Sequence, residues 1–369
     1  MDGSLRARRI SGSICIGIAL GILAWVFIPL PRPPAFLLVI DRIALPGISA
    51  SNGPMIGRGV KTPEIGSARI VFAGDIMLDR LVADRTRTAN DASYAFRKLP
   101  DGWFESFDYA VANLEGPVTD MRRSPVKSVD FLFDPTVIPV LKAQGIDAVS
   151  QANNHALDQG TVGYNDSVRR LREAGLLVFG HQVDDGPVAF ATTTIHELRI
   201  AFLGFNTTDN AMNREQAASA IALAKEEADT VIASVHWGNE YRSRPDASSV
   251  QTAHWLIDQG VDVVIGGHPH WTQGISSYKD KPIAWSLGNF IFDQDFSTQT
   301  RQGLAVALTV SKPLASDFSH LTLEPIPIHI DRSQPRIVEG EERAKRLDEL
   351  ANISDESLRD QIRAGMIGF

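Results

Sequence analysis

Two histidines one residue apart, His268 and His270, follow a short apolar run and two glycines in residues 261–274. The run is rich in β-branched residues, which predicts a buried strand of an α/β sheet. Ligand and catalytic groups gather at the carboxyl ends of such strands, and imidazole is the commonest metal ligand. A turn that merely contains two polar residues would explain the pair equally well, because a His-x-His motif alone is a moderate signal.

Four other predicted strands end in similar chemistry. The strands cover residues 68–73, 108–112, 146–149 and 230–235, and the side chains that follow them are Asp75, Asn113, Glu115, Asn153, Asn154, His155 and His236. Taken singly, an aspartate can close a turn, asparagines can cap a helix, and a histidine can be a hydrogen-bonded core residue. Five strand ends with the same character are better explained by one shared site.

The donor set in these segments favours a metal. Carboxylates, an amide oxygen and imidazoles suit a first-row divalent ion such as Mn, Fe or Zn. Two such ions about 3.5–4 Å apart clamp a phosphoryl oxygen, and Glu115 could bridge them. His155 adjoins Asn154 and suits general-acid protonation of a leaving oxygen, because its ordinary pKa lies near neutral pH. The single cysteine, Cys15, excludes a cysteine-rich zinc site.

Helical patterns alternate with the strands and must cover the sheet. They are predicted at residues 135–144, 164–173, 215–227 and 247–259, and Gly145 and Gly175 stand where the first two should end. Further strands are predicted at 176–179, 188–194, 199–204, 283–287, 304–310 and 321–329. His254 lies within a predicted helix, and we interpret it as a packing residue rather than a ligand.

Composition and the first residues bound the class of protein. The chain has 369 residues, of which 44% are hydrophobic, and its net charge of −8 argues against a general nucleic-acid binder. Arg6, Arg8 and Arg9 precede residues 10–30, which carry no charge. About 20 apolar residues suffice to cross a bilayer, and the arginines should stay in the cytoplasm. We therefore predict an uncleaved anchor at residues 1–30 with the rest extracytoplasmic; a cleaved signal peptide is the alternative.

The remaining chain divides by composition. Residues 31–67 are rich in Pro, Gly and Ser and are predicted to form a tether. Residues 68–335 are predicted to form the globular domain, and residues 336–369 a charged helical tail.

Six motifs stand in order between about residues 69 and 293: Gly74-Asp75, Asn113-Leu-Glu115-Gly-Pro, Asn154-His155-Ala-Leu-Asp158-Gln-Gly160, His236-Trp-Gly-Asn-Glu240-Tyr241, Gly267-His268-Pro-His270 and Ser286-Leu-Gly-Asn289-Phe. As a set they resemble the CapA/PgsA family of bacterial capsule and poly-γ-glutamate synthesis proteins, which is similar to calcineurin-like metallophosphoesterases. The resemblance implies an α/β fold, a four-layer α/β/β/α metallophosphoesterase-like sandwich preceded by the transmembrane helix.

The resemblance also implies roles for individual residues. Asp75 and His270 would serve one metal, Asn154, His236 and His268 the other, Glu115 would bridge, and His155 would be the acid. Substrate-binding positions would be Arg80, Asn113, Glu240 and Tyr241. Implied partners are the membrane, synthase subunits, and an anionic polymer or phosphoester substrate, with no nucleic acid.

Two positions depart from the superfamily pattern. Met77 stands where the first motif usually has histidine, and Glu115 stands where aspartate is usual. A thioether is a poor ligand for a hard or borderline ion, so the first metal site is predicted to be weak, or the protein to use one ion. The expected function is capsule or poly-γ-glutamate synthesis with metal-dependent phosphoesterase-like hydrolysis. The alternative is a non-catalytic subunit that binds polymer or supports a synthase.

Overall fold

Two β-sheets form the centre of the protein. The computed structural model describes residues 64–125, 127–180, 190–313 and 319–369, which belong to one compact unit. The first sheet has the order β14-β13-β12-β1-β2-β3-β4, with β11 paired to β1 and β15 paired to β13. Its strands are β1 (Glu64–Ile76), β2 (Tyr109–Leu114), β3 (Ala148–Ser150), β4 (Leu177–Phe179), β11 (Asn289–Ile291), β12 (Gln302–Pro313), β13 (His320–Asp331), β14 (Gln334–Ile337) and β15 (Ile367–Gly368).

The second sheet has six strands in the order β5-β6-β7-β8-β10-β9. They are β5 (Phe190–Ile195), β6 (Leu198–Asn206), β7 (Thr230–His236), β8 (Val263–Gly267), β9 (Ile275–Tyr278) and β10 (Lys281–Ala284). In each sheet the central strands run parallel: β1, β2, β3 and β4 in the first, and β6, β7, β8 and β10 in the second.

The sheets pack face to face because their strands are apolar on both faces. Along β1, Ile70 and Phe72 point into the core between the sheets, where the Phe72 ring lies 6.2 Å from that of Phe202 on β6. Their neighbours Val71 and Ala73 point to the opposite face of the first sheet. This alternation is the period of two that a strand imposes on its side chains, and it leaves each sheet with an outer face that helices must cover.

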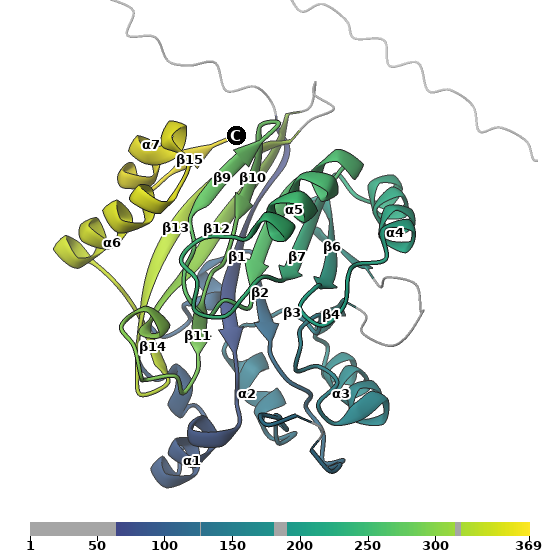
Figure 1. The fold of residues 1–369 in the computed structure, drawn as a ribbon, viewed down its shortest axis with the longest axis vertical. Helices are drawn as coiled ribbons and strands as arrows, with labels where there is room; N and C mark the ends of the chain where they lie inside the picture. Colours follow the sequence, from purple (N-terminus) through teal and green to yellow (C-terminus); the bar gives the residue numbers. More distant parts are fainter. Residues whose placement is uncertain (1–63, 126, 181–189, 314–318) are drawn as a thin grey trace, which may run out of the picture. The chain divides into compact units, whose positions relative to one another are not determined.

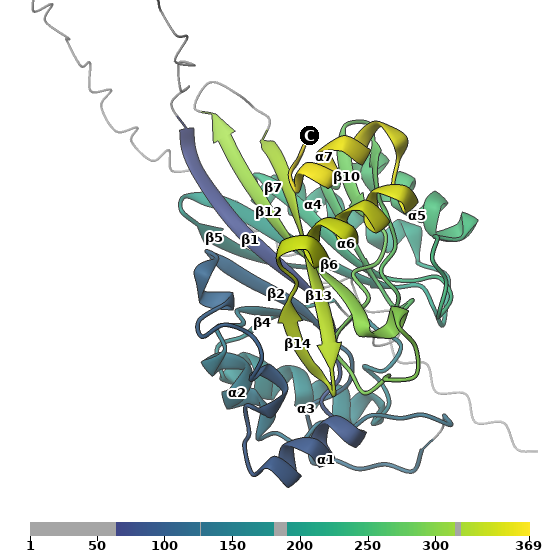
Figure 2. The same ribbon diagram turned by 90° about the vertical axis from the view of Figure 1, so that its left-hand side faces the viewer.

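Helices cover those outer faces (Figures 1 and 2). The α-helices are α1 (Arg80–Ala89), α2 (Val137–Ala143), α3 (Gly160–Glu173), α4 (Arg214–Glu227), α5 (Ala247–Gln259), α6 (Gly340–Ile353) and α7 (Arg359–Ala364), and short 3₁₀ helices occur at Tyr94–Phe96, Phe104–Ser106, Gln299–Arg301 and Glu356–Leu358. Apolar residues of α1, α2 and α3 pack on the first sheet, and those of α4 and α5 on the second. The predicted mixed α/β fold is confirmed.

The C-terminal residues are part of this core. Leu350 and Ala351 of α6 and Ile362 of α7 belong to the apolar cluster between the two sheets. In Figures 1 and 2, α6 and α7 lie together beside β13. The helical character predicted for these residues is present, and their apolar faces close one side of the sandwich.

Most of the predicted elements occur within a few residues of their expected bounds, including α5, which covers residues 247–259. Asp246 caps its start by accepting a hydrogen bond from the backbone of Ser249, and Gly260 ends it with φ 114°. Helix α1 and strands β9, β11, β14 and β15 were not predicted. No helix in the described ranges is long and apolar enough to span a bilayer, and the anchor and tether predicted for residues 1–67 lie outside those ranges except for the start of β1 at 64–67.

Candidate metal centre

Strand register places the polar residues in two facing rows. In the first sheet Asp75 on β1 pairs with Asn113 on β2, and Asn113 with Ser150 on β3. In the second sheet His236 on β7 pairs with Gly267 on β8. Because these parallel strands end at the same edge of the sandwich, residues far apart in the chain meet there.

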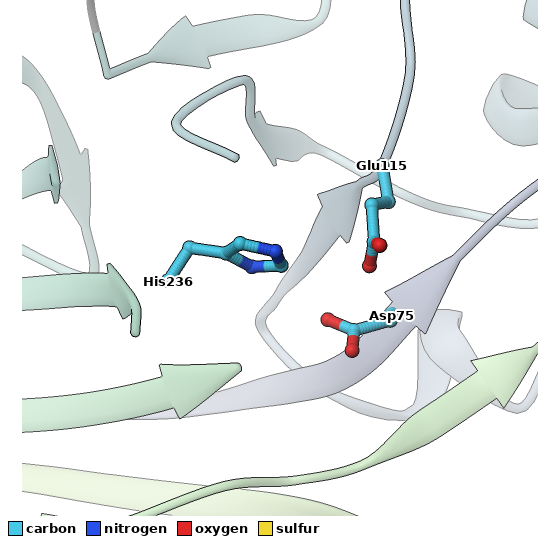
Figure 3. Close-up of side chains that lie close together, drawn as sticks. All are labelled: Asp75, Glu115 and His236. Carbon is cyan, nitrogen blue, oxygen red and sulfur yellow. The ribbon is translucent and has the colours of Figure 1, made fainter. Parts of the chain in front are cut away.

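Two buried carboxylates form one side of the site. Asp75 and Glu115 are completely buried. Asp75 Oδ1 accepts a hydrogen bond of 2.8 Å from Asn113 Nδ2, but Asp75 Oδ2 and Glu115 Oε1 have no hydrogen-bond partner within the described ranges. Figure 3 shows the two carboxylates facing each other with the ring of His236 beside them, and one donor atom from each of the three lies within 4.8 Å of the others.

His270 lies on the carboxylate side of the site. Its Nδ1 is 3.4 Å from Asp75 Oδ2 and 2.9 Å from Asn289 Oδ1. Since an amide oxygen only accepts hydrogen bonds, Nδ1 carries the proton in this arrangement. Its Nε2 is 3.9 Å from both Glu115 Oε1 and Glu240 Oε1. Nε2 is therefore the nitrogen that is free to act as a ligand.

The second group of donors surrounds Nε2 of His236. This atom lies 2.9 Å from Asn154 Oδ1 and 3.2 Å from Nδ1 of His268. The structure thus brings together all six predicted ligands, in two adjacent groups: Asp75, Glu115 and His270, and Asn154, His236 and His268. Their assignment to individual ions stays a prediction.

An unusual backbone conformation directs the side chains of His268 and His270 toward the site. His268 has φ 93° and His270 has φ 57°, values in which non-glycine residues are strained. The preceding Gly267 lets this turn approach the carboxylates, since a Cβ atom there would lie 3.0 Å from Asp75 Oδ1. Likewise a Cβ at position 74 would lie 2.1 Å from the carbonyl oxygen of Gly288, so the position directly before Asp75 in β1 requires glycine.

The electrostatics of the site favour a bound cation. Burial, and then the charges of Asp75 and Glu240, raise the pKa of Glu115 well above its usual value. Burial, and then His268, lower the pKa of His236, and burial and His270 lower the pKa of His268 to about 4. Neutral imidazoles are the form that binds metal, and a divalent ion offsets the repulsion between buried carboxylates.

The fit of a metal can be judged from these donors. Two unpartnered buried carboxylate oxygens are costly unless they meet a cation or a proton donor. Oxygen and imidazole donors at this spacing match the preferences of Mn, Fe or Zn. The residues therefore fit one divalent ion between Asp75, Glu115 and His236, and the adjoining donors offer a second position.

His155, the predicted general acid, lies beside the site. It is 7% exposed, its ring stacks on Phe131 at 4.0 Å, and its Nδ1 is 2.6 Å from Asp158 Oδ2. Asp158 also accepts a hydrogen bond from the backbone of Phe131 and lies 3.3 Å from Lys127 Nζ. These contacts fix the ring orientation and leave Nε2 as the nitrogen that can face a substrate.

The four predicted substrate-binding residues have different surroundings. Asn113 bonds to Asp75 and accepts from Asn153 Nδ2 at 3.0 Å, so it holds the carboxylate in place. The guanidinium of Arg80 pairs with the buried carboxylate of Asp293, and the Arg80 side chain as a whole is 37% exposed.

Glu240 and Tyr241 lie at the rim of the site. The Glu240 side chain is 42% exposed. The Tyr241 ring lies 6.0 Å from that of His270, and its hydroxyl accepts a hydrogen bond from Gln294. Burial, and then Glu240, raise the pKa of Tyr241 to about 12, so its hydroxyl keeps its proton. Substrate binding by these residues stays a prediction.

Sequence reasoning assigned no role to Asp158 or Asn289. Both stand in motifs that carry the family resemblance, and the spacing of three between His155 and Asp158 was a usable signal. Their partnerships with His155 and His270 follow from side-chain geometry, which spacing alone does not determine.

Met77 lies in the apolar cluster under the helices of the first sheet and is completely buried. Its sulfur accepts a hydrogen bond of 3.1 Å from the backbone N–H of Asp79. Met77 thus has a packing role in place of the ligand that the first motif usually supplies.

With this α/β fold and clustered site, the chain belongs to the family of bacterial capsule synthesis proteins PGA_cap, whose model matches residues 69–294. The predicted resemblance is confirmed. The chain is 30% identical over 275 residues to the PGA biosynthesis protein CapA of Bacillus subtilis (strain 168), covering 70% of this chain and 71% of that one. It is 28% identical over 330 residues to the capsule biosynthesis protein CapA of Bacillus anthracis, covering 84% and 78%.

Two solved structures also match this chain at low sequence identity. A hypothetical protein from Thermus thermophilus matches with a TM-score of 0.44 at 15% identity, covering 70% of this chain and 98% of that one. A putative 5'-nucleotidase from Staphylococcus aureus matches with a TM-score of 0.42 at 12% identity, covering 81% and 58%.

Proposed function

We propose that this protein takes part in capsule or poly-γ-glutamate synthesis and that its metal centre hydrolyses a phosphoester or related bond. The family assignment supports the first half, since relatives at 30% and 28% identity are described as PGA and capsule biosynthesis proteins. One observation carries the second half: Asp75 Oδ2 and Glu115 Oε1 are buried, unpartnered within the described ranges and adjacent to imidazole donors. A metallophosphoesterase-like arrangement of the four layers is part of the same proposal.

The residues have distinct tasks in this reaction. Asp75, Glu115, His236 and their neighbours would hold a divalent cation, which would act as a Lewis acid on a substrate oxygen. Asn113 orients the Asp75 carboxylate through its 2.8 Å hydrogen bond. His155, held by Asp158 at 2.6 Å, donates a proton from Nε2 to the leaving oxygen. Tyr241, Glu240 and Arg80 line the approach to these groups.

The proposal is tested by replacing a carboxylate that has an unpartnered oxygen. Glu115→Gln keeps the size of the side chain but removes its charge, so it should abolish metal-dependent turnover of a phosphodiester and lower polymer production in cells. Glu341→Gln, at an exposed position of α6, is the matched control. Normal polymer production and metal content with Glu115→Gln would refute the proposal.

A non-catalytic role is the second candidate, because Met77 replaces the usual histidine and is committed to apolar packing. In that case the candidate metal centre and its rim bind an anionic polymer or support synthase subunits without cleaving a bond. It predicts that wild-type protein has no metal-dependent turnover of any phosphoester, whereas variants at the site still impair polymer production through binding.

We also propose that residues 1–30 anchor the protein in the cell membrane by a single span, with the described domain extracytoplasmic. The uncharged stretch 10–30 after Arg6, Arg8 and Arg9 supports this. Membrane fractionation of cells expressing the full chain should recover it in the membrane. N-terminal sequencing of the mature protein that starts near residue 30 would refute the anchor.

A further inference from the structure

A second pocket lies beside the metal centre, between α6 and the first sheet. Its volume is about 350 Å³, which is within the range of small-molecule sites. It is lined by Ser243, Trp271, Thr272, Gln299, Gln302, Gly303, Leu304, Pro327, Arg346, Glu349, Leu350 and Ile353. None of these residues belongs to the site described above.

Arg346 is the unusual member of this lining. Its side chain is only 10% exposed, and no hydrogen bond to its guanidinium occurs within the described part of the chain, where its Nε is buried without a partner. Burial lowers the pKa of Arg346 below its usual value. An arginine with five N–H donors normally pairs with a carboxylate or phosphate when it is withdrawn from water.

The nearest carboxylate does not satisfy this group. Glu349 Oε2 lies 3.4 Å from Arg346 Nε, in an ion pair that does not meet hydrogen-bond geometry, and the Glu349 side chain is 47% exposed. Within the described part of the chain, this one contact leaves the other N–H groups of the guanidinium without a carboxylate partner. The guanidinium therefore keeps its capacity for a two-point interaction with a planar anion.

The pocket adjoins the metal centre through one short segment. Trp271 follows His270 directly and lines the pocket. The Tyr241 ring lies 6.0 Å from the ring of His270 and 6.4 Å from that of Trp271. The Tyr241 and Trp271 rings thus connect the metal centre to the pocket.

We propose that this pocket binds a carboxylate of an anionic polymer substrate, with Arg346 as the recognition residue. This rests on the proposed function in one respect, since poly-γ-glutamate carries a free carboxylate on each unit. Ser243, Gln299 and Gln302 offer neutral polar side chains in the lining around that group, whereas Leu304, Leu350 and Ile353 bound the apolar part of the pocket.

Calorimetric titration of the full-length protein in detergent tests this proposal. The probe is a synthetic tetramer of γ-linked glutamate, and its comparator is the same tetramer with carboxylates converted to amides. Arg346→Gln should weaken binding of the acidic tetramer roughly ten- to hundred-fold, the usual effect of losing charge-assisted hydrogen bonds. Lys142→Gln is the control, because it removes the same charge from an exposed residue outside the pocket lining.

Two further variants keep the test independent of any folding defect in Arg346→Gln. Glu349→Gln removes the competing carboxylate and should tighten binding. Ser243→Glu adds a negative charge at an exposed position of the lining and should weaken binding relative to Ser243→Gln. Equal affinity in the wild type, Arg346→Gln and Lys142→Gln, or equal affinity for the amide tetramer, would overturn the proposal.

Metal removal separates this proposal from the proposed function. If the acidic tetramer still binds through Arg346 when a chelator has removed the metal, the pocket proposal is supported even if the metal centre proves inactive. Binding that depends on metal but not on Arg346 overturns the pocket and leaves the metal centre in place. Free glutamate that binds as tightly as the tetramer overturns the assignment to a polymer.

Discussion

The Nε2 atom of His236 lies 2.9 Å from Oδ1 of Asn154, although the two residues are 82 positions apart and follow strands of different sheets. The contact exists because β3 and β7 end at the same edge of the sandwich. His268 Nδ1 lies 3.2 Å from the same atom. Three potential metal ligands from three chain segments thus lie close together, two of them within hydrogen-bonding distance of the third. A cation at this position would be bound by residues that only the tertiary structure brings together.

The first prediction concerns the content of divalent metal in the purified protein. His236→Ala removes a donor close to Asp75, Glu115, Asn154 and His268, so it should lower metal content severely, as should His268→Ala. His254→Ala is the control, because His254 stacks on Tyr278 at 3.8 Å and has a packing role. Elemental analysis gives the stoichiometry, and equal metal content in the three variants would contradict a shared centre.

The second prediction concerns proton donation. His155→Ala should slow turnover of a phosphodiester roughly 10²–10⁴-fold, the usual contribution of a positioned acid. Metal content should be nearly unchanged, since His155 Nδ1 is engaged with Asp158. The loss should be smaller for a nitrophenyl phosphodiester, whose acidic leaving group needs little protonation.

Asp158→Asn tests how His155 is held. It should slow turnover less than His155→Ala, because the amide oxygen can still accept a hydrogen bond from Nδ1 and hold the ring in place. A wild-type protein without any metal-dependent turnover, together with normal polymer production by His155→Ala, would favour the non-catalytic role.

The third prediction concerns Met77. Met77→His offers the ligand that the first motif usually contains, so metal content should rise if the new imidazole reaches the carboxylate of Asp75. The metal-free variant should melt at a lower temperature than the wild type, because an imidazole replaces a thioether in a fully buried apolar cluster. Thermal unfolding with and without added metal measures both effects; a destabilised variant with unchanged metal content would assign Met77 to packing alone.

The fourth prediction concerns stability against acid. Asp166 on α3 accepts hydrogen bonds from Thr119, Arg169 and Arg170. Burial by itself would raise the pKa of this carboxyl, but the hydrogen bonds outweigh it and lower the pKa from 3.8 to about 2. A pKa that is lower in the folded state stabilises the protein above pH 4, and this stabilisation is lost as the pH falls toward 2.

Asp166→Asn should therefore lower the free energy of unfolding by about 2 kcal/mol at neutral pH and have little effect near pH 2. Asp84→Asn is the control, since the Asp84 side chain is 57% exposed and pairs with Arg87 inside α1. Denaturant titrations over this pH range give both differences. A loss for Asp166→Asn that does not change with pH would show that shape rather than charge is responsible.

The predicted strand ends were recognisable because their signal is local. A β-branched run, a glycine and a polar residue within about ten positions mark the end of a buried strand, as at Asp75, His236 and His268. Helix α1 was not recognised, because its sequence is polar on average and only Val82 of its ten residues is buried. Its N-cap, Asp79, was a usable signal that was assigned no such role.

The sequence by itself determined which donors are present, on which strand ends they stand, and to which family the chain belongs, since all of these depend on residues close together in the chain. Tertiary structure alone decided that Asn154 meets His236 and that Met77 packs in a core, whereas the spacing of three between His155 and Asp158 was already visible in the sequence. It also decided that α6 carries Arg346 to a pocket beside the metal centre. The physical reason is that most of these contacts join segments tens to hundreds of residues apart, and only the packing of two sheets and their helices sets the distances between them.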